Sequence, residues 1–115
     1  GAHTHTHRVL STLDLTTQRE EMTLSKAILE QEIGNRVNSI AYPVGGYQHF
    51  TQESCNMGEQ VGYKLGFSYN TGIDSWETIH PFNIRRISAQ EDSAKWPLWP
   101  LLNIFPKIFA RTIER

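Results

Sequence analysis

The 115-residue sequence lacks several features that would narrow its class at once. It has one cysteine, Cys55, which excludes an internal disulfide and a cysteine-based zinc knuckle. Its 11 basic and 12 acidic residues give a formal net charge of −1, so the bulk charge does not indicate nucleic acid or an anionic membrane as a partner. It also lacks an apolar run long enough to span a bilayer. The length fits at most one small domain.

The densest chemistry lies at the start of the chain, in the three histidines His3, His5 and His7. On an extended strand His3 and His7 would lie roughly 13 Å apart, too far for two metal bonds of about 2 Å each. In a tightly turned segment the same step covers about 6 Å. A shared metal site therefore requires a turn directly after Ala2, with His3 and His7 as ligands and His5 facing elsewhere.

The histidine triplet is also compatible with three origins unrelated to such a site. It would fit an expression tag or cloning scar, although ordinary protein sequence follows from Arg8. A free Gly1-Ala2-His3 terminus is able to chelate Cu(II) through its amine, two amides and the imidazole. The third origin is a chance group of surface histidines.

Apolar and turn-forming residues indicate helices that alternate with strands. Gly34 is placed to end a first helix, and Thr51 is a typical cap for a second. The expected elements are a helix over residues 16–33, a strand over 37–42, a helix over 51–63, a strand over 65–69 and a strand over 83–89. This order predicts an α/β fold with parallel strands. Three or four strands do not close a barrel, so the chain is expected to form part of one.

The first predicted helix has an apolar face and an acidic beginning. The residues expected to face the core are Met22, Ala27, Leu29 and Ile33. Glu20 and Glu21 fall early in the helix, where the helix dipole favours negative charge. We expect both carboxylates to lie on a solvated face.

Composition changes near residue 90, which divides the chain into a predicted domain over residues 1–90 and a segment over residues 91–115. That segment is rich in aromatic and apolar residues and is interrupted by prolines. It is too short and too broken to span a bilayer. Packing against the rest of the domain is the expected role, and binding at a membrane interface is the alternative.

Several motifs in order resemble one known family. They are His3-Thr4-His5-Thr6-His7, then Ala41-Tyr42-Pro43 with Gly45, then Gly62-Tyr63. This series is similar to the polysaccharide deacetylase family, also called the nodulation-protein-B homology domain or carbohydrate esterase family four. The resemblance covers roughly residues 1 to 88.

The resemblance implies a partial irregular (β/α) barrel and a metal-dependent hydrolase that removes N-acetyl groups from a polysaccharide or an N-acetylated sugar. The family's His-Ser/Thr-x-x-His motif makes His3 and His7 ligands of a divalent metal, usually zinc. Thr4 would support the loop that presents them, and His5 would have no ligand role. The expected partner is an N-acetylated polysaccharide, and an extracytoplasmic or membrane-associated location would fit the family.

The resemblance also implies catalytic groups outside the histidine motif. The segment 41–45 corresponds to the loop whose backbone amide helps to hold the oxyanion, so the N–H of Val44 takes that role although the loop lacks the family's arginine. The general acid of the family is a histidine, and His80 is the candidate for it because no other histidine is near that region; a position on the surface without a catalytic role is the alternative. Arg86 occupies the position of a basic residue near the active site, and Asp74 resembles part of a further motif only loosely.

Three aromatic residues are expected at the rim of the site, where their rings would stack on sugar faces: Tyr42, Tyr47 and Trp76.

One motif of the family is missing from this sequence. The Asp-Asp pair that supplies the base and a third metal ligand is absent. This predicts either the carboxyl-terminal part of a longer enzyme or a degenerate member, with weak activity on its own. The alternative function is a non-catalytic metal- or carbohydrate-binding remnant. Open strand edges also predict a hazard of self-association.

Overall fold

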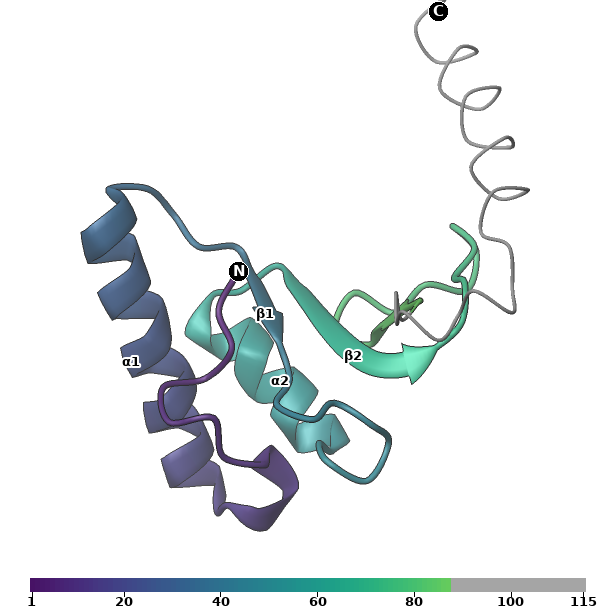
Figure 1. The fold of residues 1–115 in the computed structure, drawn as a ribbon, viewed down its shortest axis with the longest axis horizontal. Helices are drawn as coiled ribbons and strands as arrows, with labels where there is room; N and C mark the ends of the chain where they lie inside the picture. Colours follow the sequence, from purple (N-terminus) through teal and green to yellow (C-terminus); the bar gives the residue numbers. More distant parts are fainter. Residues whose placement is uncertain (88–115) are drawn as a thin grey trace, which may run out of the picture.

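The computed structural model describes residues 1–87 of the chain, which form one layer of helices against a parallel sheet (Figure 1). The elements are the 3-10 helix η1 (Leu10–Thr12), α1 (Leu15–Ile33), β1 (Ser39–Ala41), α2 (Gln52–Val61), β2 (Leu65–Thr71) and β3 (Ile84–Arg86). The sheet has the order β1-β2-β3, and both pairings are parallel. The predicted α/β fold with an open, partial sheet is therefore confirmed.

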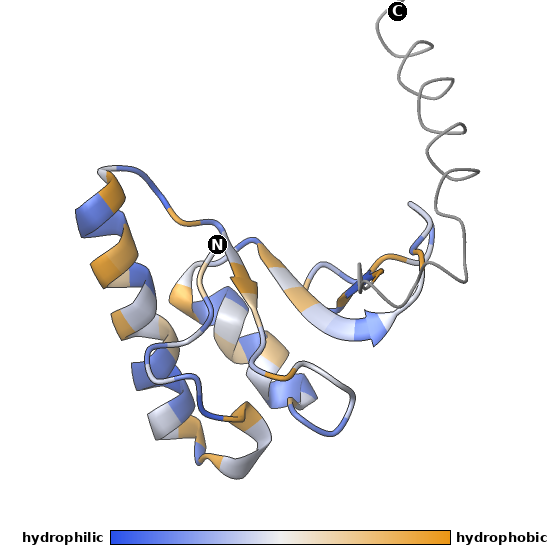
Figure 2. Cartoon of the chain, viewed as in Figure 1, coloured by the Kyte–Doolittle hydropathy of each residue, from blue (hydrophilic) through white to orange (hydrophobic). Residues whose placement is uncertain are grey.

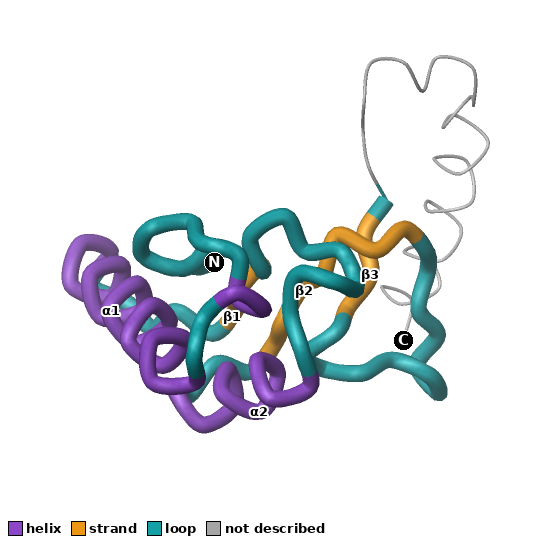
Figure 3. Tube along the Cα trace, turned by 90° about the horizontal axis from the view of Figure 1, so that it is seen from below, coloured by secondary structure: helices purple, strands orange, loops and turns teal. Residues whose placement is uncertain are grey.

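The start of the chain lies beside β1, where Ala2 makes a parallel bridge to Ile40. Helices α1 and α2 lie on the same side of the sheet (Figure 3). Along β2 the colouring changes from hydrophobic at its beginning to hydrophilic at its carboxyl end (Figure 2). Within residues 1–87, no helix combines the length and the apolar character that crossing a bilayer requires. The predicted segment over residues 91–115 and the end of the predicted last strand lie outside the described residues.

Local signals in the sequence explain where the two helices begin and end. The side chain of Asp14 accepts a hydrogen bond from the Thr17 N–H and caps α1, which ends at Gly34 with φ of 69°. Thr51 caps α2 through a reciprocal capping box with Ser54. The predicted boundaries of both helices are confirmed within two residues at each end.

The predicted core face of α1 is confirmed at Met22, which is buried, and at Leu29, which packs against the core, but it is wrong at Ala27 and Ile33. Its buried residues are Gln18, Glu21, Met22 and Ser25, whereas Ile33 is 63% exposed and Ala27 is exposed. Polar contacts account for this face, because the Gln18 amide donates to the Leu13 carbonyl and accepts from Ser54 Oγ. A helix that packs through hydrogen bonds does not show its buried face in an apolar pattern.

Tyr42 belongs to the core, not to a rim. Its ring stacks on Phe50 with centroids 4.5 Å apart, and its hydroxyl donates to the Phe82 carbonyl at 2.8 Å. Burial raises the pKa of Tyr42. The expectation that Tyr42 stacks on sugar is wrong for this structure, because the side chain is fully buried and has no ring face available.

The buried hydroxyl of Tyr42 generates a stability prediction. We expect Tyr42→Phe to lower the free energy of unfolding by about 0.5–1.5 kcal/mol, the net value of one hydrogen bond. The loss is limited because Cys55 Sγ still donates to the Phe82 carbonyl. Urea denaturation measures it, with Tyr47→Phe as the control because Tyr47 is 71% exposed. Equal stability of the two variants would contradict a structural role for the Tyr42 hydroxyl.

Candidate functional site

His3 lies at the carboxyl end of β1, where backbone hydrogen bonds of the preceding residue, Ala2, and a hydrogen bond of its own ring hold it in place. The Ala2 N–H donates to Ser39 O at 2.8 Å, and the Ala41 N–H donates to Ala2 O at 2.9 Å. His3 Nδ1 lies 2.9 Å from Ala41 O. Because a carbonyl only accepts, Nδ1 donates in this hydrogen bond, and Nε2 is the ring nitrogen that remains for a metal ion. A backbone carbonyl that orients an imidazole in this way is typical of metal-binding histidines.

The chain turns sharply after His3 and brings His7 back to it. Thr4 and His7 both have φ of 60°, and the rings of His3 and His7 lie 4.7 Å apart between centroids with their planes at 57°. The predicted turn is therefore present and the two rings lie side by side, while their role as metal ligands stays a prediction. Left-handed backbone is unfavourable for a β-branched residue such as Thr4, and each such position costs about 1–3 kcal/mol.

Glu21 of α1 holds the middle of this turn. Its Oε2 accepts from the backbone N–H groups of His5 at 2.9 Å and Thr6 at 2.8 Å, and its Oε1 accepts from Thr6 Oγ1 at 2.6 Å. Burial raises the pKa of Glu21, but the hydrogen bonds from Thr6 and His5 outweigh burial and leave the pKa below its usual value. The expectation that Glu21 is solvated is wrong, because Glu21 is buried and fully hydrogen-bonded.

Thr4 is buried in the turn, but its hydroxyl does not hold the loop. Within residues 1–87, Thr4 Oγ1 is a buried atom without a hydrogen-bond partner. His5 is exposed. In the described part of the chain, no group of three histidine, cysteine, aspartate or glutamate side chains is close enough to bind one ion. The structure therefore supplies a histidine pair.

Val44 lies in the loop that follows β1, three residues after the carbonyl that orients His3. It has φ of 59° and is 52% exposed. Its neighbours are fixed, since Gly45 N donates to Pro43 O at 2.6 Å and Gly45 O accepts from Tyr69 N at 2.7 Å. Within residues 1–87 no hydrogen bond engages the Val44 N–H. An N–H in a fixed loop that has no hydrogen-bond partner among residues 1–87 suits an oxyanion donor.

His80 lies apart from the histidine pair. It precedes β3, and the adjacent Pro81 carbonyl accepts from Gly66 N at the beginning of β2. The strands are parallel, so His80 lies at the amino end of this part of the sheet, while His3 lies at the carboxyl end of β1. His80 Nδ1 accepts from Phe82 N at 3.2 Å. The structure does not bring His80 into contact with His3 among the described residues.

His80 does share a cavity with Tyr47. The cavity has a volume of about 490 Å³ and is lined by Tyr47, Phe50, Thr51, Gln52, Cys55, His80 and Asn83. Cys55 is buried, and burial raises the pKa of its thiol. The cavity lies beside the beginning of α2 and is separate from the turn that carries the histidine pair. Trp76, the other aromatic residue predicted to bind sugar, is 95% exposed on the loop between β2 and β3.

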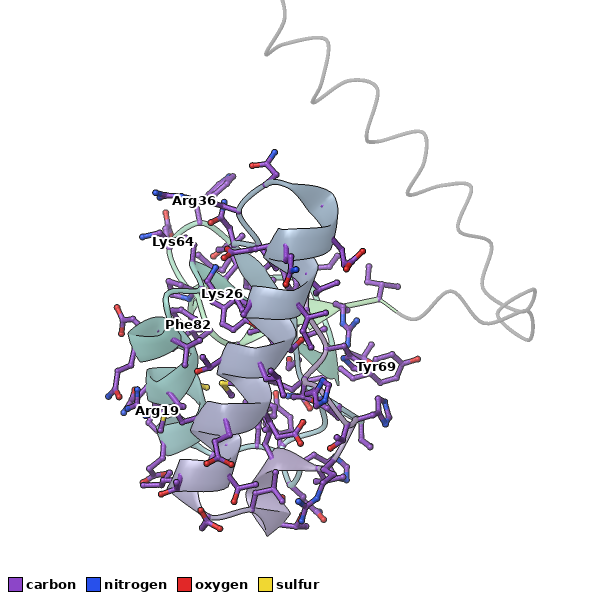
Figure 4. All side chains as sticks on the ribbon, turned by 90° about the vertical axis from the view of Figure 1, so that its left-hand side faces the viewer. Arg19, Lys26, Arg36, Lys64, Tyr69 and Phe82 are labelled. Atoms are coloured by element: carbon purple, nitrogen blue, oxygen red, sulfur yellow. The ribbon has the colours of Figure 1, made fainter. Side chains whose placement is uncertain are left out.

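Tyr69 was not predicted as a site residue, although it lies near the carboxyl end of β2. It points away from the side of the chain on which Phe82 lies (Figure 4). The Arg86 guanidinium is 5.2 Å from the centre of the Tyr69 ring, and Arg86 Nε donates to Ser68 O at 2.7 Å. In the sequence of β2, residues that face the core alternate with residues that face outward. This alternation was the signal that places Tyr69 on the outward face of the strand.

Comparisons with known proteins agree with this geometry. The protein is an α/β protein with a parallel sheet and a histidine pair at the carboxyl edge of that sheet. The sequence profile of the polysaccharide deacetylase family matches residues 1–66. The chain therefore belongs to the polysaccharide deacetylase family. No curated protein sequence matches the chain.

Solved structures of deacetylases share the fold. The chain is similar to the Streptococcus pyogenes deacetylase PplD in complex with acetate, with 29% identity and a TM-score of 0.68 over 74% of this chain and 36% of that chain. IcaB from Ammonifex degensii has 20% identity and a TM-score of 0.64, over 79% and 41%. The BpsB deacetylase domain from Bordetella bronchiseptica has 19% identity and a TM-score of 0.56, over 64% and 26%. This chain thus spans less than half the length of each of these proteins.

Asp74 generates a prediction about acid stability. Its carboxylate accepts from the backbone N–H of Arg85 at 2.8 Å and from Arg85 Nε at 2.7 Å. These bonds hold the pKa of Asp74 below its usual value. A lowered carboxyl pKa stabilises the fold at pH above the ordinary value, and this contribution is lost as the pH falls through the lowered pKa.

We therefore expect the unfolding midpoint of the unmodified chain to fall more steeply with acid, from about pH 5 to about pH 2, than that of Asp74→Asn. Urea denaturation at a series of pH values measures the difference. Glu77→Gln is the matched control, because Glu77 is exposed on the same loop. Parallel curves for Asp74→Asn and the unmodified chain would show that this ion pair does not contribute.

Proposed function

We propose that this chain carries part of the active site of a metal-dependent N-deacetylase that acts on an N-acetylated polysaccharide or oligosaccharide. The observation that carries the proposal is the pairing of His3 with His7, in which the proton on His3 Nδ1 is fixed by Ala41 O. Family membership supports deacetylation in general. The proposal of a metal ion with two histidine ligands goes beyond what family membership supports, and it rests on the histidine pair.

The residues present fit a zinc ion as two of its ligands. Zinc takes imidazole nitrogens at about 2.0–2.1 Å and usually has three protein ligands in catalytic sites. His3 and His7 supply two such nitrogens on one side of the turn. A zinc ion bound there would supply Lewis acidity toward the acetyl carbonyl and an acidified water.

The chain's own groups have separate parts in this proposal. The Val44 N–H donates to the oxygen of the acetyl carbonyl as negative charge develops on it. Tyr47 and Trp76 present exposed rings on which sugar faces stack. The acid role of His80 stays a prediction, and its place at the amino end of the sheet gives that role no support from the described contacts.

Metal binding tests the proposal directly. We expect the chain to bind zinc in calorimetry, and His3→Ala and His7→Ala each to weaken binding by at least tenfold, because two ligands are already fewer than a closed site needs. His5→Ala is the matched control, since His5 is exposed within the same motif. The amino terminus is extended in every variant to remove the terminal copper-type chelate. Binding that is indifferent to His7 would overturn the proposed centre.

Activity is expected to be weak in this chain alone. Within residues 1–87 a third ligand close to His3 and His7 is absent, and the sequence lacks the Asp-Asp pair that supplies the base in the family. Release of acetate from an N-acetylglucosamine oligomer should therefore stay close to the uncatalysed rate with zinc added. Rapid turnover that a chelator abolishes would show that the described residues are sufficient. Zinc binding without any turnover, also when the missing Asp-Asp motif is supplied, would favour the non-catalytic binding module instead.

A further inference from the structure

We propose that Glu21 is a positioning residue for the metal centre: from α1 it fixes the turn that brings His3 and His7 together. The inference rests on the proposed function for the identity of the ligand, and on the hydrogen bonds of the turn for its geometry. In the described part of the chain, the hydrogen bonds of Glu21 go to His5 N, Thr6 N and Thr6 Oγ1 and not to the rings of His3 or His7, so its effect passes through the residues between them.

The turn needs support from outside itself. It contains two left-handed residues that are not glycine, Thr4 and His7. Such a conformation persists only where the surroundings hold it. The Thr4 hydroxyl gives no such support, because it has no hydrogen-bond partner within residues 1–87.

Glu21 supplies this support at the centre of the turn. Both carboxylate oxygens accept hydrogen bonds from the two residues between Thr4 and His7, at distances from 2.6 to 2.9 Å. Bonds to an ionised acceptor are the stronger kind. Glu21 is buried on α1, so the turn is anchored to a helix and not to another loop.

Glu20, the neighbour of Glu21, provides a matched comparison. The two carboxylates are adjacent on α1 and have the same charge and length, but Glu20 is exposed. No hydrogen bond or ion pair to the Glu20 side chain is found within residues 1–87. A change at Glu20 therefore alters the charge near the turn without altering its anchoring.

Three substitutions at Glu21 separate hydrogen bonding from charge. Glu21→Ala removes every acceptor. Glu21→Gln keeps the bonds without the charge, because its amide oxygen accepts both backbone N–H groups and its amide NH₂ donates to Thr6 Oγ1, which is also able to accept. Glu21→Asp keeps the charge but is one methylene too short to reach the same three donors.

The first readout does not depend on metal. Amide hydrogen exchange of His5 and Thr6, followed by NMR in the metal-free chain, reports how often the turn opens. We expect exchange at these two amides to accelerate at least tenfold in Glu21→Ala and Glu21→Asp. It should change less than threefold in Glu21→Gln and Glu20→Ala.

The second readout is zinc affinity by calorimetry, with the same order of variants. Loss of a group that orients ligands typically costs 10–100-fold in metal affinity, so Glu21→Ala and Glu21→Asp should fall in this range while Glu21→Gln and Glu20→Ala stay within threefold of the unmodified chain. A thermal melt of each variant confirms that it is folded. If Glu21→Ala does not fold, Glu21→Asp against Glu21→Gln decides the question.

The outcomes separate this inference from the proposed function. Absence of zinc binding by the unmodified chain would overturn the metal centre, and the exchange rates would still test the anchoring. Zinc binding and exchange that are equal in Glu21→Asp and the unmodified chain would overturn the positioning role. A fall in Glu21→Gln with Glu21→Asp close to the unmodified chain would overturn it as well, because charge and not the hydrogen bonds would then be responsible.

Discussion

The candidate site depends on the parallel pairing of the first residues with β1. Two short backbone hydrogen bonds place Ala2 between Ser39 and Ala41, and they bring the start of the chain to a strand almost forty residues later in sequence. His3 is consequently the first side chain past the paired residue, where it meets the Ala41 carbonyl. Without this pairing the histidines would have no fixed relation to the Val44 loop.

The turn that follows is held from the side of the helices. A strained backbone at Thr4 and His7 is compensated by hydrogen bonds to Glu21, which is buried in the face of α1 that also carries Gln18. Polar residues thus take part in packing that is usually attributed to apolar ones. In this arrangement α1 packs against α2 and also holds the loop at the sheet's carboxyl edge.

The sheet formed by residues 1–87 is open at one edge. Three strands and the paired first residues leave β3 at an edge of the described sheet, and exposed apolar side chains such as Ile73 and Trp76 lie on the loop before it. The chain spans 36% of the length of PplD and 41% of that of IcaB. The predicted self-association through an open edge stays a prediction.

Local signals were sufficient for much of the fold. Asp14 and Gly34 define the limits of α1 through a side-chain cap and a left-handed glycine, and Thr51 begins α2; each signal acts within a few residues and can be read without tertiary structure. The buried face of α1 could not be predicted in this way, because it is held by side-chain hydrogen bonds to partners elsewhere in the chain.

By itself the sequence determined the α/β order of elements and the family. It also selected His3 and His7 as the two histidines that a turned chain brings together, because a shared metal ion would restrict two ligands to a short separation; their ligand role stays a prediction. Tertiary structure alone decided that Tyr42 is buried, that His80 lies away from the pair and that Glu21 anchors the turn. Each of these depends on contacts between residues more than ten positions apart. Such contacts cannot be predicted from composition or from the spacing of residues in the sequence.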